Sequence, residues 1–171
     1  VPSSDVDNYE NDDNKQIYDF AFSAASYVCN LIADSKVVGL GWGRTLHKIA
    51  ENLDNPKVLS SRVFVPLASR DTSVVNRQHQ TSAITYLFSE KVQADSFFFN
   101  KMDGGSELNN SYQAACLEVI NDLWSKLDTA IFGLGTALRY PSIYTGELTP
   151  ERLEYYNYDY EAQGEILAQA Y

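Results

Sequence analysis

The chain has 171 residues, of which 44% are hydrophobic and 21% are charged, as in an ordinary soluble globular protein with one well-packed domain. Its net charge of −10 argues against binding to nucleic-acid phosphates or to an anionic membrane surface. The charge still allows a small phosphorylated ligand, because a few local cations and N–H groups are enough to bind one. No apolar stretch is long enough to span a bilayer, and no signal-peptide pattern opens the chain.

The two cysteines and two histidines give no sign of a metal site. Cys29 and Cys116 both fall in amphipathic helical patterns, so we expect buried free thiols and a reducing, cytoplasmic setting. Neither cysteine has a Cys or His at metal-ligand spacing, and His47 and His79 lie far apart in the sequence. We therefore expect no metal and no cofactor.

The first predicted element is a helix that follows a polar, acidic segment. Residues 1–14 read as a loop or a frayed terminus, with Asp13 or Asn14 as the helix cap. The apolar residues that follow recur at helical spacing and predict a single core-facing side of the helix. These residues are Ile17, Phe20, Ala21, Ala24, Tyr27, Val28, Leu31 and Ile32.

Strands and helices then alternate along the chain. The predicted strands cover residues 37–40, 62–67, 96–100 and 128–132, and the predicted helices cover 45–53, 74–91, 108–127 and a segment from Thr149. Their core faces are Leu46, Ile49, Ala50 and Leu53, then Ala83, Ile84, Leu87 and Phe88, then Ala115, Val119, Leu123 and Leu127. Residues 164–171 fit a strand or a helix. This alternation is typical of βαβ units and predicts an α/β fold with a mainly parallel sheet.

Right-handed crossovers place the strand-to-helix turns of a parallel sheet at one edge. Segments 39–45, 68–73 and 133–139 should therefore converge on one candidate site. Pro66, near the end of its strand, fits a strand that leaves the sheet at that point.

The most informative segment is Gly39-Leu-Gly-Trp-Gly-Arg-Thr45, in which a strand ends in closely spaced glycines before a helix. A helix N-terminus offers unpaired N–H groups and the positive end of the helix dipole, which suit a phosphate. Glycine allows a ligand to approach the backbone closely and tolerates a positive φ. Arg44 supplies a guanidinium that is always charged and has several hydrogen-bond donors, and Thr45 supplies a hydroxyl group or a helix cap. The dinucleotide spacing Gly-x-Gly-x-x-Gly is absent. From these residues alone, a purely structural turn explains the segment equally well. The candidate ligand residues are Gly41, Trp42, Gly43, Arg44 and Thr45.

Three further segments supply candidate ligand groups. Ser69 and Arg70 follow the second strand, where Arg70 offers a second cation or, as the residues alone favour, pairs with Asp71 in a solvated loop. Residues 76–80 are rich in groups that suit sugar hydroxyls, or that form a capped and solvated first helical turn. Segment 133–139 repeats Gly-Leu-Gly and leads into a loop that covers a ligand or simply connects two elements. Its candidate residues are Gly133, Gly135, Thr136 and Arg139.

Motifs of catalysis are missing from the sequence. There is no Gly-x-Ser-x-Gly elbow, no Walker loop, and no supported Ser/His/Asp or Cys/His arrangement. An anion-binding turn without a chemical motif favours a binding module over an enzyme.

The order of these segments resembles the sugar-binding, or effector, domain of SorC/DeoR-type bacterial transcriptional regulators. The matching motifs are Val37-Val-Gly-Leu-Gly-Trp-Gly-Arg-Thr-Leu46, Val63-Phe-Val-Pro-Leu67, Leu127-Asp-Thr-Ala-Ile-Phe-Gly-Leu-Gly135, Leu148-Thr-Pro-Glu-Arg-Leu153 and Gly164-Glu-Ile-Leu167. The resemblance implies a Rossmann-like three-layer α/β sandwich related to sugar-phosphate isomerases. It also implies a pocket for a phosphorylated sugar or polyol and assembly into a homo-oligomer.

The resemblance also assigns roles to positions of this sequence. It implies that Gly43, Arg44 and Thr45 bind phosphate or its neighbouring hydroxyls, that Gln78 contacts the sugar, that Gly133 and Gly135 line the pocket, and that Glu161 accepts hydrogen bonds from hydroxyls. The family often has a Gly-Gly pair after the second strand. This chain has Ala68-Ser69-Arg70 there, so an arginine side chain takes the place of the backbone N–H groups that the glycine pair offers to a ligand.

The resemblance finally implies a domain organisation. Members of the family carry an N-terminal helix-turn-helix domain and continue past the Gly-Glu-Ile-Leu segment. We therefore expect residues 1–171 to be a single, shortened effector domain, with DNA bound only through a separate domain and with no membrane contact. The alternatives are a sugar-phosphate isomerase-like enzyme and an oligomerisation module without a ligand.

Overall fold

The structure is a computed structural model that describes residues 4–53, 61–68, 77–97, 107–135, 165–166 and 169–170. Its main sheet has four parallel strands in the order β3-β2-β1-β4. The strands are β1 (Val37–Leu40), β2 (Val63–Pro66), β3 (Asp95–Ser96) and β4 (Thr129–Ile131). The helices are α1 (Ser4–Ala33), α2 (Arg44–Glu51), the short 3-10 helix η1 (Arg77–His79), α3 (Thr81–Val92) and α4 (Glu107–Ser125). The predicted α/β class with a mainly parallel sheet is confirmed.

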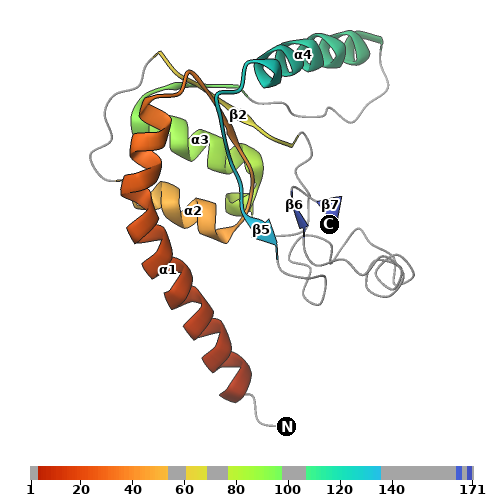
Figure 1. Ribbon diagram of the computed structural model, residues 1–171. Coiled ribbons are helices and arrows are strands. Elements are labelled where there is room, and N and C mark those ends of the chain that lie inside the picture. The colour runs from red at the N-terminus through yellow and green to blue at the C-terminus, as the bar shows by residue number, and fades with distance from the viewer. Residues whose placement is uncertain are drawn as a thin grey trace.

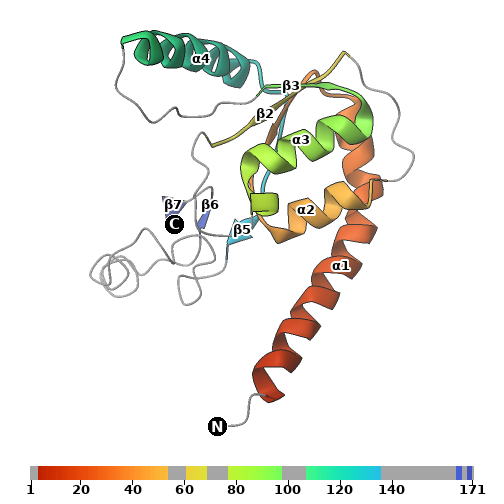
Figure 2. The same ribbon diagram turned by 180° about the vertical axis from the view of Figure 1, so that it is seen from behind.

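Three helices cover one side of the sheet. Figures 1 and 2 show α1, α2 and α3 packed together on one side of the strands, while α4 lies apart from them across the sheet. Among the described residues, no helix is long and apolar enough to cross a membrane.

The core lies where β1 and β2 meet α1, α2 and α3. All four residues of β1 are buried, as expected for a central parallel strand that is covered on both faces. Phe64 of β2 and Phe88 of α3 are fully buried, with their ring centroids 6.3 Å apart. The predicted core side of the second helix is confirmed, because Leu46, Ile49, Ala50 and Leu53 are all buried.

Gly39 is the one glycine of β1, and close packing explains it. A Cβ at this position would overlap the side chain of Leu67 and lie 3.0 Å from the side chain of Leu127. The strand therefore needs glycine because side chains from two other segments fill the space above it.

Asp128 fixes the start of this strand, since its carboxylate accepts hydrogen bonds from the amides of Lys36 at 2.7 Å and Val37 at 2.9 Å. These bonds lower the pKa of Asp128.

The predicted N-terminal loop is wrong for the described residues, because α1 already begins at Ser4. Asp13 and Asn14 lie inside the helix and do not cap it. The acidic residues that suggested a loop are also compatible with a helix start, where negative charge interacts favourably with the helix dipole.

The predicted core side of α1 is only partly correct. Ala21, Val28 and Ile32 are buried, whereas Phe20 is 60% exposed and Tyr27 is 69% exposed. The buried stripe is narrower than the apolar pattern and continues through Ala25. The reason is that this helix has more apolar positions than its single packed side can use.

The predicted core side of α4 is wrong for most of its length. Ala115 is exposed, Val119 is 45% exposed, and Ile120 is the buried residue in the part of this helix whose side chains are described. Trp124 anchors the end of the helix, since its indole N–H donates to the carbonyl of Pro66 at 2.9 Å.

The expected burial of Cys29 and Cys116 is also wrong, since both are partly exposed, although both are free thiols.

Three smaller predictions have different outcomes. Helix α3 begins at Thr81, not at residue 74, because η1 comes first. In the C-terminal segment the strand alternative is correct for the described residues. There, a second, antiparallel sheet is formed by β5 (Leu134–Gly135), β6 (Glu165–Ile166) and β7 (Gln169–Ala170). The predictions for residues 98–106 and for a helix from Thr149 lie outside the described residues.

Candidate functional site

The turn between β1 and α2 is fixed by backbone hydrogen bonds to two other segments. The amide of Gly41 donates to the carbonyl of Ile131 at 2.9 Å, and the amide of Gly43 donates to the carbonyl of His79 at 3.0 Å. These two amides are therefore used within the protein and are not free for a ligand, contrary to the expectation from the sequence. What they provide is a rigid frame for the first turn of α2.

Gly43 is the N-cap of α2 and has φ 118° and ψ 162°. This conformation strongly favours glycine, and beyond its chain neighbours no heavy atom of the described residues lies within 4 Å of the place where a Cβ would stand. No side chain caps the helix, so the alternative in which Thr45 is the cap is wrong. Among the described residues, none fills the Cβ side of this glycine at the helix N-terminus.

The first turn of α2 has the features of an anion site. The amides of Arg44, Thr45 and Leu46 precede the first intrahelical hydrogen bond, in which the amide of His47 donates to the carbonyl of Gly43 at 3.1 Å. No acidic side chain lies in this turn, and Arg44 is exposed. Amides without an intrahelical partner, a positive dipole end and a guanidinium together favour a bound anion such as a phosphate.

The turns after β1 and β4 converge, as the topology predicted. The amide of Gly41 donates to the carbonyl of Ile131, and the carbonyl of Trp42 lies 4.0 Å from the place where a Cβ on Gly133 would stand. The second Gly-Leu-Gly segment is nevertheless not a copy of the first turn. Leu134 and Gly135 form strand β5, which pairs with β6, so this segment leads into a second sheet and not into a helix.

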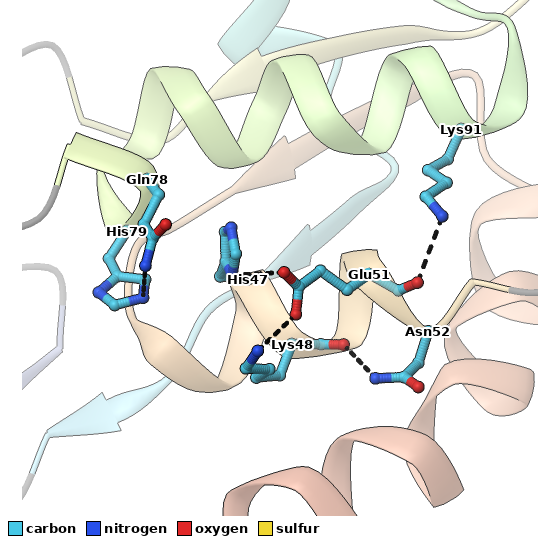
Figure 3. Close-up of polar contacts among 7 residues, drawn as sticks. All are labelled: His47, Lys48, Glu51, Asn52, Gln78, His79 and Lys91. Carbon is cyan, nitrogen blue, oxygen red and sulfur yellow. Dashed lines mark hydrogen bonds and ion pairs between the residues drawn. The ribbon is translucent and has the colours of Figure 1, made fainter. Parts of the chain in front are cut away.

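The short helix η1 brings Gln78 and His79 to the same place. Because the carbonyl of His79 accepts from Gly43, η1 is held directly against the turn. Gln78 is exposed, and its amide nitrogen lies 3.2 Å from the imidazole Nε2 of His79. Figure 3 shows both side chains at the end of α2 where that helix begins.

His47 and His79, which are far apart in the sequence, are in contact in the structure. Their rings meet edge to face with centroids 5.2 Å apart. The sequence analysis missed this pair, because nothing in the spacing showed that η1 would pack on α2. Among the described residues, no group of three or more His, Cys, Asp or Glu side chains could hold a metal ion.

Cations outnumber carboxylates around this histidine pair. Burial lowers the pKa of His79, and the nearby charges of His47, Arg44 and Lys48 lower it further. Glu51 is the carboxylate in this group, and its pKa is lowered mainly by a hydrogen bond from Lys48 at 2.6 Å. Its other oxygen lies 3.7 Å from Nδ1 of His47, which has no hydrogen-bond partner among the described residues (Figure 3).

Protonation of His79 gives a testable pH dependence of stability. The pKa of His79 in the folded protein lies below its ordinary value of 6.5, so the unfolded chain binds more protons below that pH. The stability present above pH 6.5 is therefore lost as the pH falls towards the folded-state pKa. We expect the unfolding free energy, measured by urea denaturation, to fall more for the wild type than for His79→Gln between about pH 7.5 and about pH 5.5. Equal losses would show that His79 does not cause the change.

Five candidate residues lie outside the described residues, and their roles stay predictions. They are Ser69, Arg70, Thr136, Arg139 and Glu161.

A search of protein families and known structures identifies the type of domain. Residues 5–171 match the family described as "Putative sugar-binding domain". The chain belongs to this family of sugar-binding domains. It is 24% identical over 115 residues to a sorbitol operon regulator of Klebsiella pneumoniae, an alignment that covers 66% of the chain and 36% of that regulator.

Solved structures of transcriptional regulators share the fold of this sugar-binding domain. The full-length sorbitol operon regulator SorC of Klebsiella pneumoniae superposes with a TM-score of 0.76 at 21% identity, covering 92% of this chain and 52% of that one. A DeoR family regulator from Listeria monocytogenes superposes with a TM-score of 0.66 at 21% identity, covering 91% and 61%. The Rossmann-like α/β fold expected from the resemblance is therefore confirmed. The chain spans only about a third to three fifths of the length of these relatives.

Proposed function

We propose that this chain is the effector-sensing domain of a transcriptional regulator and that its effector is a phosphorylated sugar or polyol. Membership of the sugar-binding family supports the sugar. The observation that supports the phosphate is the first turn of α2, where no described residue fills the Cβ side of Gly43, the turn has no acidic side chain, and Arg44 is exposed. Phosphate is the group that this combination of amides and guanidinium suits best.

The site supports binding more than catalysis. A sugar-phosphate isomerase needs a positioned carboxylate base near the sugar carbons. Glu51 is the carboxylate of the histidine cluster, and it is already hydrogen-bonded to Lys48. The relatives identified above are regulators, which also supports a role in sensing. Turnover of a sugar phosphate by the purified chain would contradict this part of the proposal.

Regulation requires the effector to distinguish two states of the whole protein. A ligand shifts an equilibrium only through its different affinities for the two states. We propose that those states belong to a cytoplasmic homo-oligomer that binds DNA through a separate helix-turn-helix domain. Size-exclusion chromatography with light scattering, with and without ligand, tests the oligomer.

A thermal-shift panel tests the ligand class. The panel contains glucose 6-phosphate, fructose 6-phosphate and sorbitol 6-phosphate, each beside its unphosphorylated parent. A ligand at about one hundred times its Kd stabilises the folded state by roughly 2.7 kcal/mol and raises Tm. The proposal expects this increase for at least one phosphorylated compound, and the absence of any increase contradicts it.

Replacing Arg44 by alanine tests which part of the ligand the guanidinium binds. We expect affinity for the phosphorylated ligand to fall about tenfold to one-hundredfold, because a hydrogen bond to a charged group is worth roughly 1.5–3 kcal/mol. Affinity for the unphosphorylated parent should hardly change. Isothermal titration calorimetry gives both values.

The matched control for Arg44 is Lys126→Ala. Lys126 directly follows α4 and is paired with Asp122 of that helix at 2.6 Å, away from the turn, so its removal should leave both affinities unchanged. Equal losses for the phosphorylated and unphosphorylated compounds in Arg44→Ala would show that Arg44 does not bind the phosphate.

A further inference from the structure

His79 lies against the N-terminal part of α2, where the phosphate is proposed to bind. Its own carbonyl accepts a hydrogen bond from Gly43, the N-cap of α2, and its ring contacts that of His47 at a centroid distance of 5.2 Å. The residue is only partly exposed. Backbone and ring contacts therefore hold this titratable group at the opening of the site, where no sequence motif placed it (Figure 3).

Among the described residues, the charged side chains on the helices that pack around His79 include more cations than carboxylates. On α2 these are Arg44, His47, Lys48 and Glu51, on η1 there is Arg77, and on α3 there are Glu90 and Lys91. Glu51 is hydrogen-bonded to Lys48. Glu90 accepts from the Tyr86 hydroxyl on the exposed side of α3, and Lys91 donates to the carbonyl of Glu51 at the far end of α2. In a chain with a net charge of −10, the described residues here form a local region in which cations outnumber the carboxylates Glu51 and Glu90.

We infer that His79 is a ligand-binding residue that takes up a proton from solvent and donates a hydrogen bond to the dianionic phosphoryl group held by the first turn of α2. The inference rests on the proposed function and adds that the site binds the phosphoryl group as a dianion, with His79 protonated. Burial, and after it the neighbouring cations, disfavour a charged imidazole in the absence of ligand, and a dianion favours it. Binding should therefore tighten as the pH falls from about 7.5 to about 6.5, until the phosphate itself gains a proton near its second pKa of about 6.

Direct titration of the imidazoles tests this inference in the unmodified chain. The chain has two histidines, so two-dimensional NMR gives two resolvable ring signals, which the variants His47→Gln and His79→Gln assign. With glucose 6-phosphate, fructose 6-phosphate or sorbitol 6-phosphate bound, we expect the pKa of His79 to rise above its value in the free protein. A pKa for His79 that is the same with and without a bound phosphorylated sugar would overturn the inference, and this measurement does not depend on how well a variant folds.

Calorimetry in two buffers of different ionisation enthalpy measures how many protons the protein takes up when the ligand binds. At about pH 7 we expect the wild type to take up a substantial fraction of one proton per ligand, and His79→Gln to take up almost none and to bind about tenfold to one-hundredfold more weakly. The matched variant His47→Gln should keep the proton uptake. Uptake that persists in His79→Gln, or disappears in His47→Gln alone, overturns the role of His79 and leaves the proposed function standing. Failure of every phosphorylated sugar to bind the wild type removes both proposals.

Discussion

Replacing Phe88 by alanine should lower the free energy of unfolding by about 3–5 kcal/mol, which is a large part of the stability of a domain of this size. Phe88 is fully buried on α3, and its ring lies 6.3 Å from that of Phe64 on β2. The substitution removes apolar surface from the core and leaves a cavity between a helix and the sheet, which rigid elements cannot close completely. Urea denaturation followed by circular dichroism measures the change.

The matched control is Phe22→Ala on α1. Phe22 is 58% exposed, so its replacement leaves no cavity and should change the free energy of unfolding by less than about 1 kcal/mol. Comparable losses in the two variants would contradict the packing described here, because they would mean that the exposed side of α1 is as well packed as the core.

The segment from Val37 to Glu51 shows how much local sequence can predict. A short apolar run, closely spaced glycines and a helical repeat are all local signals, and β1, its turn and α2 agree with the predictions. The core side of α2 was also correct, because an eight-residue helix with one clear apolar side has a single way to pack.

The long helices show where local sequence is insufficient. Helix α1 has apolar residues on more than one side, and which of them are buried depends on where α2 packs. The pattern therefore gave no reason to bury Ala25 and expose Tyr27. In α4 the apolar residues indicated a helix correctly, but only its contact with the sheet decides that Ile120 is buried and Val119 is not.

The candidate site was predictable in position and not in detail. Parallel strand order placed the turns after β1 and β4 at one edge, and the hydrogen bond from the Gly41 amide to the Ile131 carbonyl confirms this. The contact of His79 with Gly43 and His47 was not predictable, since it joins segments that are more than thirty residues apart through packing of η1. Tertiary packing, and not a motif, determines which titratable groups surround the first turn of α2.

Replacing Gly43 by alanine should reduce stability by about 1–3 kcal/mol and weaken binding of a phosphorylated sugar at least about tenfold. The expected cost is conformational, because the φ of 118° is unfavourable for alanine while the space for a Cβ is empty. If the backbone relaxes to relieve that strain, the hydrogen bonds from Gly43 to His79 and from His47 to Gly43 are distorted. The N–H groups of the first turn of α2 would then no longer be oriented to bind one phosphate together.

Gly133→Ala is the matched control for Gly43→Ala, since it lies across the same opening. Its φ lies outside the positive range, and the nearest atom to an added Cβ is the carbonyl oxygen of Trp42 at 4.0 Å. Denaturation should therefore show a change within about 0.5 kcal/mol for Gly133→Ala. Equal losses of stability in the two variants would contradict backbone strain at Gly43. A normal ligand affinity in Gly43→Ala would mean that the first turn of α2 does not hold the phosphate, because the glycine that shapes that turn would then be dispensable for binding.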